Sequence, residues 1–67
     1  MKCGSKMRLA RQVRGFTLEE AAELINIHFT TLAKLELDQI TPSVPMLMDI
    51  AKAYDVPPAS LLPDEED

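Results

Sequence analysis

The sequence predicts an all-α fold, a compact bundle of four to five short helices. Apolar residues recur at helical spacings along most of the chain, and no segment shows the alternation that is typical of a strand. The apolar fraction of 46% is mainly aliphatic, with only two Phe and one Tyr, which favours helices. A chain of 67 residues has room for one domain. A domain of this size buries only about 60% of its unfolded surface, so its helices must pack closely.

A first helix is predicted over residues 5–14. Gly15 ends it, because glycine readily adopts the left-handed conformation that follows many helices. The apolar stripe of this helix is imperfect and consists of Met7, Leu9, Ala10 and Val13. Cys3 precedes the helix and is expected to be a free thiol at a mobile end of the chain, because no second cysteine is present.

A second helix is predicted over residues 17–25. Thr17 and Glu20 fit a capping box, in which the threonine oxygen accepts a hydrogen bond from the first turn and the glutamate bonds back. The two glutamates at 19 and 20 also suit the start of a helix electrostatically. The apolar positions at helical spacing are Leu18, Ala21, Ala22 and Leu24 or Ile25.

A third helix is predicted over residues 28–37, one tight turn later. Asn26 stands at the turn because asparagine tolerates a left-handed backbone, and Ile27 is expected to be a buried plug between the two helices. Two helices joined in this way form a helix-turn-helix, whose second helix can lie in the DNA major groove. The side chains expected to face inward are Thr31, Leu32 and Leu35, and those expected to face outward or sideways are Phe29, Thr30, Ala33 and Lys34.

A loop, a fourth helix and a last helical turn complete the predicted fold. Ser43 caps the helix at 44–54, and Pro45 is tolerated in its first turn. The apolar stripe of this helix consists of Leu47, Ile50, Ala51 and Tyr54. Residues 58–62 are expected to form one turn over the core, covering it with Leu61 and Leu62.

The charge of the chain is unevenly distributed. Its formal net charge of −4 is unfavourable for binding DNA. Residues 64–67 are all acidic and are predicted to be a disordered tail, so the domain at 1–63 carries equal numbers of acidic and basic side chains. Five of the seven basic residues lie in the first 14 positions, where they form a local basic edge.

The composition argues against several classes of protein. Cys3 is the only cysteine and His28 the only histidine, which nearly excludes a zinc site or a Cys/His nucleophile. No nucleophile stands beside a base and the chain has no room for a substrate cleft, so neither an enzyme nor a bound cofactor or metal is expected. Because no signal peptide and no apolar run near 18 residues is present, we expect a cytoplasmic protein with no membrane segment.

From about Met7 to Leu62, a series of short sequence elements occurs in the order and spacing of a known family, without gaps. The elements are Arg8-Leu9-Ala10-Arg11, Gly15-Phe16-Thr17, Glu19-Glu20-Ala21-Ala22, Leu32, Leu35-Glu36, Pro42-Ser43, Leu47, Ile50-Ala51, Ala53, Val56 and Leu61-Leu62. In this order the chain resembles the lambda-repressor/Cro-like helix-turn-helix family, also called the XRE family. The resemblance implies a lambda-repressor-like fold with a central helix-turn-helix and a recognition helix at about 28–37. It also implies a homodimer, with Tyr54 and segment 56–63 as candidates for its contact.

The resemblance further implies an ion pair between Arg11 and Glu36. Such a pair would orient the first helix against the recognition helix, and loss of either partner would strand a partly buried charge. Two independent surface charges are the alternative.

The resemblance also indicates which residues would contact double-stranded DNA. His28 either caps the recognition helix or donates to a phosphate, Phe29 either contacts a thymine methyl group or packs against protein, and Lys34 contacts a phosphate or is solvated. The full set facing the groove is His28, Phe29, Thr30, Ala33 and Lys34. Further phosphate contacts, or ordinary solvated side chains, are Arg8 and Arg14 on the first helix and Gln39 and Thr41 in the later loop.

Several of these positions depart from the family pattern. Leu18 stands where a phosphate-binding glutamine is usual, and glycine is common at the positions of Asn26 and Asp38. His28 replaces a serine or threonine cap, and Phe29 replaces a polar residue that reads bases. The sequence therefore predicts a small transcription regulator of the repressor type that binds specific double-stranded DNA as a homodimer. A protein-interaction module on the same scaffold stays open, as does an antitoxin that binds both operator DNA and a toxin.

Overall fold

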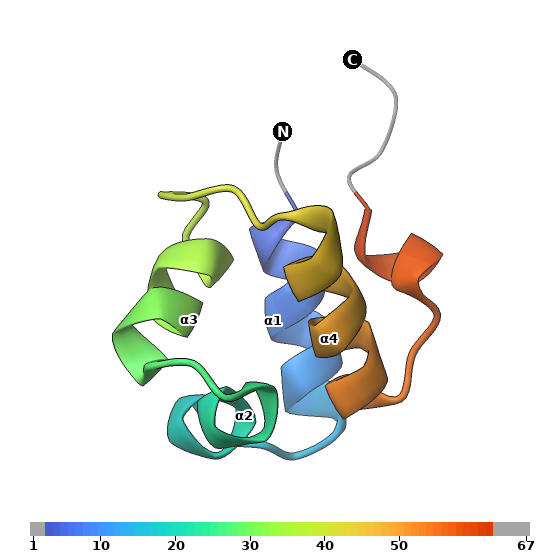
Figure 1. Ribbon diagram of the computed structural model, residues 1–67. Helices are drawn as coiled ribbons and strands as arrows, with labels where there is room; N and C mark the ends of the chain where they lie inside the picture. Colours follow the sequence, from blue (N-terminus) through green and yellow to red (C-terminus); the bar gives the residue numbers. More distant parts are fainter. Residues whose placement is uncertain (1–2, 63–67) are drawn as a thin grey trace.

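Helices account for most of residues 3–62, the part of the chain that this computed structural model describes. They are α1 (Gly4–Val13), α2 (Leu18–Ile25), α3 (Phe29–Glu36), α4 (Val44–Tyr54) and the 3₁₀ turn η1 (Pro58–Leu61) (Figure 1). No strand is present within this range. The all-α prediction is confirmed, and each predicted helix begins and ends within one residue of its expected bounds. The acidic tail predicted at 64–67 lies outside the described residues.

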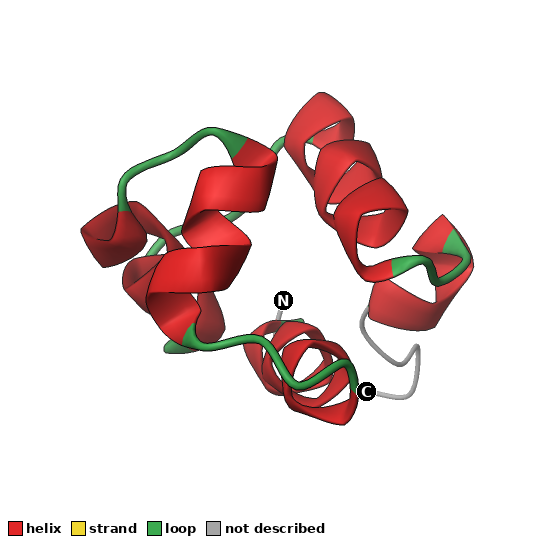
Figure 2. Ribbon diagram, turned by 90° about the horizontal axis from the view of Figure 1, so that it is seen from below, coloured by secondary structure: helices red, strands yellow, loops and turns green. Residues whose placement is uncertain are grey.

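The core is enclosed by the inner faces of all five elements. In Figure 1, α3 lies to the left of α1, α4 lies to its right, and α2 closes the lower end. Figure 2 shows the connecting loops running around the outside of the helices. Tyr54, the last residue of α4, is completely buried, and its ring centre lies 6.1 Å from that of Phe16. The largest fully buried side chains are Tyr54, Met7, Leu32, Leu35, Ile50 and Leu61.

The capping signals in the sequence are confirmed. The Thr17 hydroxyl oxygen accepts a hydrogen bond from the Glu20 amide at 3.1 Å, and the Glu20 carboxylate accepts one from the Thr17 amide at 2.9 Å. The Ser43 hydroxyl oxygen caps α4 by accepting from the Met46 amide at 3.3 Å. Asn26 adopts the left-handed conformation with φ 68°, which turns the chain from α2 into α3. Ile27 is half-buried against the core rather than fully buried.

The apolar stripe predicted for α1 is wrong at two positions. Leu9 is 62% exposed and Val13 is 73% exposed. The face that meets the core instead begins at Cys3 and Gly4 and continues through Met7, at spacings of three and four. Cys3 is a free thiol, as predicted, but its position at a mobile end is wrong because it is buried. Burial raises the pKa of the Cys3 thiol above its ordinary value.

The last turn, η1, is present but covers the core with only one leucine. Leu61 is buried, whereas Leu62 is 46% exposed because the chain becomes extended where η1 ends. The complete burial of Tyr54 also corrects its expected place in a dimer contact, since its side chain reaches no outer surface. None of the helices in residues 3–62 has the length and hydropathy needed to cross a membrane.

Candidate nucleic-acid interface

The inner side of α3 is anchored in the core. Leu32 and Leu35 are buried and lie three residues apart, on one side of the helix. At the start of the helix, Nδ1 of His28 accepts a hydrogen bond from the Thr30 amide at 3.2 Å. His28 therefore acts as the N-cap, one of the two roles that the sequence left open for it.

A bidentate ion pair fixes the last residue of α3 to α1. Nε of Arg11 lies 2.7 Å from one carboxylate oxygen of Glu36, and its Nη2 lies 3.0 Å from the other. The remaining Nη1 donates to the Phe16 carbonyl at 2.9 Å. The two side chains are only 12% and 6% exposed, so they are not independent surface charges. The hydrogen bond to Glu36 raises the pKa of the Arg11 guanidinium.

A second attachment, which the sequence reasoning missed, joins the start of α1 to the end of α3. The Gly4 amide donates to a carboxylate oxygen of Asp38 at 3.0 Å, and Asp38 is held in the left-handed conformation with φ 62°. A Cβ atom on Gly4 would lie 2.7 Å from the Glu36 carbonyl carbon and 2.8 Å from the Leu35 oxygen. The first helix was predicted to begin just after Gly4, and residue type alone gave no signal of this contact with a segment more than 30 residues away.

The outer side of α3 is open to solvent at its first turns. Phe29 is 40% exposed, and Thr30 and Lys34 are also exposed, while Ala33 is half-buried. The structure thus places the predicted groove-facing residues together on one surface. The two loop residues predicted to contact phosphate, Gln39 and Thr41, are exposed shortly after the helix ends.

Arg8 lies beside this surface. It is exposed on α1 and lines a shallow hollow between α1 and α3 together with Leu18, Ala33 and Leu37. Leu37, the last residue of the predicted recognition helix, is exposed, as is Ile40 in the following loop. The sequence reasoning assigned neither of them a contact with DNA, although two apolar residues at the end of that helix and just after it were a signal.

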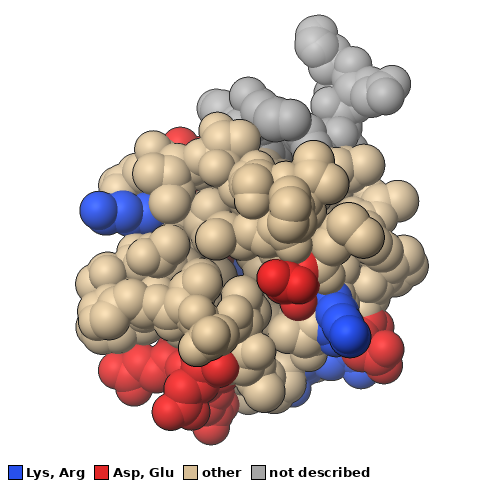
Figure 3. All heavy atoms as spheres, viewed as in Figure 1, with Lys and Arg blue, Asp and Glu red and all other residues tan. Residues whose placement is uncertain are grey.

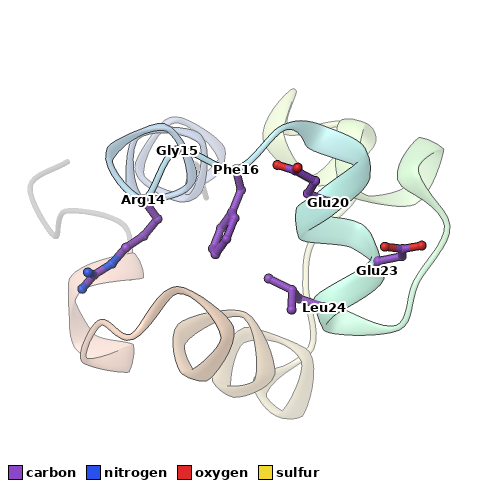
Figure 4. A pocket seen from close by; sticks show the side chains of 6 residues that line it. All are labelled: Arg14, Gly15, Phe16, Glu20, Glu23 and Leu24. Atoms are coloured by element: carbon purple, nitrogen blue, oxygen red, sulfur yellow. The ribbon is translucent and has the colours of Figure 1, made fainter.

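Arg14 does not lie with the other predicted phosphate contacts, and its assignment is corrected. Its Nε donates to the Tyr54 carbonyl at 2.7 Å and its Nη2 to the Asp55 carbonyl at 2.9 Å. Figure 4 shows the side chain turned toward the end of α4, away from α2 and α3. The guanidinium therefore satisfies carbonyl groups at the end of α4, where no further helical amide is available. The nearby hollow of about 640 Å³ is lined by Arg14, Gly15, Phe16, Glu20, Glu23 and Leu24.

Acidic side chains border the first turn of α3. Glu19 and Glu23 of α2 line a hollow together with His28 and Phe29. Figure 3 shows acidic side chains gathered over α2 at the lower left, with a basic side chain at the left edge beside α3. The surface around α3 is thus mixed in charge, in contrast to a continuous basic face.

These features define a class of domain. Short helices in this order, with α2 and α3 joined by a tight turn and α3 exposed on one side, form a helix-turn-helix domain of the lambda-repressor type. A family model described as Helix-turn-helix matches residues 7–61. The chain therefore belongs to this helix-turn-helix family, the XRE family that the sequence resembled.

Individual proteins share this sequence pattern or fold. The chain is 35% identical over 66 residues to the HTH-type transcriptional regulator ImmR of Bacillus subtilis (strain 168), with 98% of this chain and 52% of that protein covered. It therefore spans about half the length of this curated relative. The solved structure of the restriction-modification controller protein C.AhdI from Aeromonas hydrophila is similar, with a TM-score of 0.86, 25% identity, and 90% and 87% of the two chains covered.

A more distant structure shares the fold alone. An HTH_3 family transcriptional regulator from Vibrio cholerae has a TM-score of 0.81 at 21% identity, with 87% of this chain and 33% of that chain covered.

Proposed function

We propose that this chain is the DNA-binding domain of a small transcriptional regulator and that α3 enters the major groove of double-stranded DNA. The observation that carries the proposal is the two-sidedness of α3. Leu32 and Leu35 fix one side in the core, while the other presents a ring, a hydroxyl and a cation to solvent. A helix held in this way can place its N-terminal residues against base edges. The names of ImmR and C.AhdI, a transcriptional regulator and a controller protein, support a regulatory role. Such a role places the protein in the cytoplasm of a bacterial cell.

The phosphate contacts in this proposal are few. Arg8 and Lys34 supply the cations beside α3, and Gln39 and Thr41 supply polar groups in the loop. With two to three phosphates contacted by each copy, the affinity of one copy for its half-site should fall roughly 10- to 40-fold between 50 and 200 mM salt. Non-specific binding is then weak, and specificity must come from the base-facing residues of α3.

The experiment is selection of bound sequences from a random duplex pool, followed by a salt titration of the selected duplex by fluorescence anisotropy. Lys34→Ala should weaken binding to all duplexes alike and reduce the salt slope by about 0.9 for each bound copy, the effect of losing one phosphate contact per copy. Lys52→Ala is the matched control, because Lys52 is an exposed lysine on α4, across α1 from α3. A folded protein that binds no duplex at 50 mM salt would overturn the proposal.

We also propose that the chain acts as a homodimer through an apolar groove between α1 and η1. The groove has a volume of about 400 Å³ and is lined by Lys6, Leu9, Ala10, Val13, Arg14, Val56, Ser60 and Leu61. Leu9 and Val13 expose more than half of their surface here. A second copy seated on this groove would remove that apolar surface from water and would place two copies of α3 on one duplex.

Sedimentation and the symmetry of the selected duplex test the dimer. Half-sites about 34 Å apart, arranged as an inverted repeat, are expected for a two-fold dimer. Val13→Lys should give a monomer with weakened operator binding, whereas Leu24→Lys, at an exposed apolar position on α2, should leave the dimer intact. A Val13→Lys protein that sediments as a dimer would exclude this groove as the contact.

A protein-binding module is the second candidate function. It is favoured by exposed apolar side chains that begin directly after α3 and continue into α4, namely Leu37, Ile40, Val44 and Met48. A well-folded protein without affinity for any duplex at low salt would favour this candidate. An antitoxin would bind both a duplex and a protein partner.

A further inference from the structure

The first turn of α3 presents a fixed hydrogen-bonding polarity. Nδ1 of His28 lies 3.2 Å from the backbone nitrogen of Thr30 and 2.7 Å from its hydroxyl oxygen. A backbone N–H can only donate, so Nδ1 must offer its lone pair, and the ring proton of a neutral imidazole is then on Nε2. The Thr30 hydroxyl in turn donates to Nδ1, which leaves the lone pairs of its oxygen free to accept.

A ring stack holds this arrangement in place. The rings of His28 and Phe29 are 4.8 Å apart at their centres and inclined by 27°. The stack restrains the imidazole, while Phe29 keeps an exposed apolar surface. Within residues 3–62 the imidazole of His28 hydrogen-bonds only to Thr30, so its Nε2–H is available to a ligand. The turn therefore offers an apolar face, a donor and an acceptor side by side.

We infer, resting on the proposed DNA-binding function, that this turn reads a thymine beside a purine. The Phe29 ring covers the thymine C5-methyl group, the His28 Nε2–H donates to the N7 atom of the purine, and the Thr30 oxygen accepts from an exocyclic amino group. Each of these groups is exposed in the major groove of B-DNA. His28 and Phe29, which depart from the family pattern, are thus the residues with which this chain recognises its particular bases.

The local charge favours a base edge over a phosphate as the acceptor for His28. Glu19 and Glu23 line the same hollow as His28 and Phe29. These carboxylates repel a phosphate at this point, whereas purine N7 carries no net charge. The phosphate contacts of α3 fall instead to Lys34, one turn further along the helix.

The tautomer can be tested in the free protein. Long-range ¹H–¹⁵N NMR spectra of the full chain at pH 8 should show the proton of the neutral His28 ring on Nε2. Thr30→Val, which removes the hydroxyl but keeps the backbone amide, should leave the same tautomer. A proton on Nδ1 in the unmodified chain would overturn the assigned polarity.

The base contacts can be tested on the selected duplex. Replacing each thymine in turn by deoxyuridine removes one methyl group, and at one thymine per half-site the unmodified protein should lose about fourfold in affinity. Phe29→Ala should show no loss at that thymine, while the control Leu24→Ala should behave as the unmodified protein. If a duplex is bound but no thymine methyl group matters to the unmodified protein more than to Phe29→Ala, this inference is wrong and the proposed function stands. If no duplex can be selected at all, both the inference and the proposed function are wrong.

The donor is tested with 7-deazapurines, which lack N7. The unmodified protein should lose about fivefold at one purine, the effect of one hydrogen bond. His28→Ser keeps a capping oxygen but loses the ring Nε2–H, and its hydroxyl ends too close to the backbone to replace that donor, so it should be insensitive to that replacement. If His28→Ser instead abolishes sensitivity to a neutral methylphosphonate in the backbone, the acceptor is a phosphate and the assignment to N7 is wrong.

Discussion

Replacing Arg11 by Met tests how α3 is attached to the rest of the domain. The Arg11 side chain makes two hydrogen bonds to the Glu36 carboxylate and one to the Phe16 carbonyl. Methionine keeps much of the aliphatic volume but removes every donor. The Glu36 carboxylate, only 6% exposed, would then be buried without its partner.

The expected magnitude follows from this burial. Removal of one partner from a buried ion pair costs about 3–5 kcal/mol. Because water reaches the 12% of the Arg11 side chain that is exposed, we expect the lower end, about 3 kcal/mol. A 67-residue domain has a total stability of roughly 3–10 kcal/mol, so the loss is a large fraction. Arg11→Met combined with Glu36→Met removes the stranded charge and should recover much of the loss.

Urea denaturation followed by far-UV circular dichroism measures these free energies of unfolding. The four proteins of the cycle are compared with Arg8→Met, an exposed arginine on the same helix, which should change stability by less than about 0.5 kcal/mol. If Arg11→Met costs less than about 1 kcal/mol, or if the two single losses simply add in the double variant, the pair does not attach α3.

Two further changes test the core and the close contact between α1 and α3. The hydroxyl of Tyr54 is buried without a hydrogen-bond partner in residues 3–62, so Tyr54→Phe should raise the free energy of unfolding by up to about 1 kcal/mol; a loss of that size would contradict the reasoning. Burial raises the pKa of Tyr54 to about 12, so the contribution of its neutral form to stability is fully present below pH 10. About 2–3 kcal/mol of the free energy of unfolding should then be lost as the pH rises from 10 through 12. Urea titrations of Tyr54→Phe should not show this loss. Gly4→Ala should lower the free energy of unfolding by about 1–3 kcal/mol, because its Cβ would press on the backbone at the end of α3. Ser5→Ala, one residue on and exposed, is the control and should not lower it. If thermal unfolding gives Gly4→Ala the same melting temperature as the unmodified protein, the close contact is refuted.

The parts of the fold that depend on neighbouring residues could be predicted from sequence. The capping box of Thr17 and Glu20 and the left-handed turn at Asn26 involve residues within four positions of one another. The inner face of α1 could not be predicted in this way. Leu9 and Val13 form a stripe as regular as the one through Met7, and packing of Cys3 and Gly4 against the end of α3 decides between them.

In the candidate site, too, the features that depend on nearby residues could be predicted and those that depend on distant residues could not. The outward residues of α3 follow from helical periodicity, and the pairing of Arg11 with Glu36 was implied by the family resemblance. The direction of Arg14 depends on carbonyls 40 and 41 residues away, and the bond from Gly4 to Asp38 spans 34 residues, so local pattern carries neither. The polarity of the His28 ring depends on which nitrogen meets Thr30, a matter of geometry that residue type does not encode.

Because the inner side of α3 holds the helix in the domain and the outer side is exposed, the outer side can be engineered separately. Its hold on the domain comes from Leu32, Leu35 and Glu36, none of which lies on the open side. Positions 29, 30 and 34 can therefore be randomised together in a library while the scaffold keeps its melting behaviour. Variants with a new preference for duplex sequence can therefore be sought by changing these three side chains, without redesigning the core.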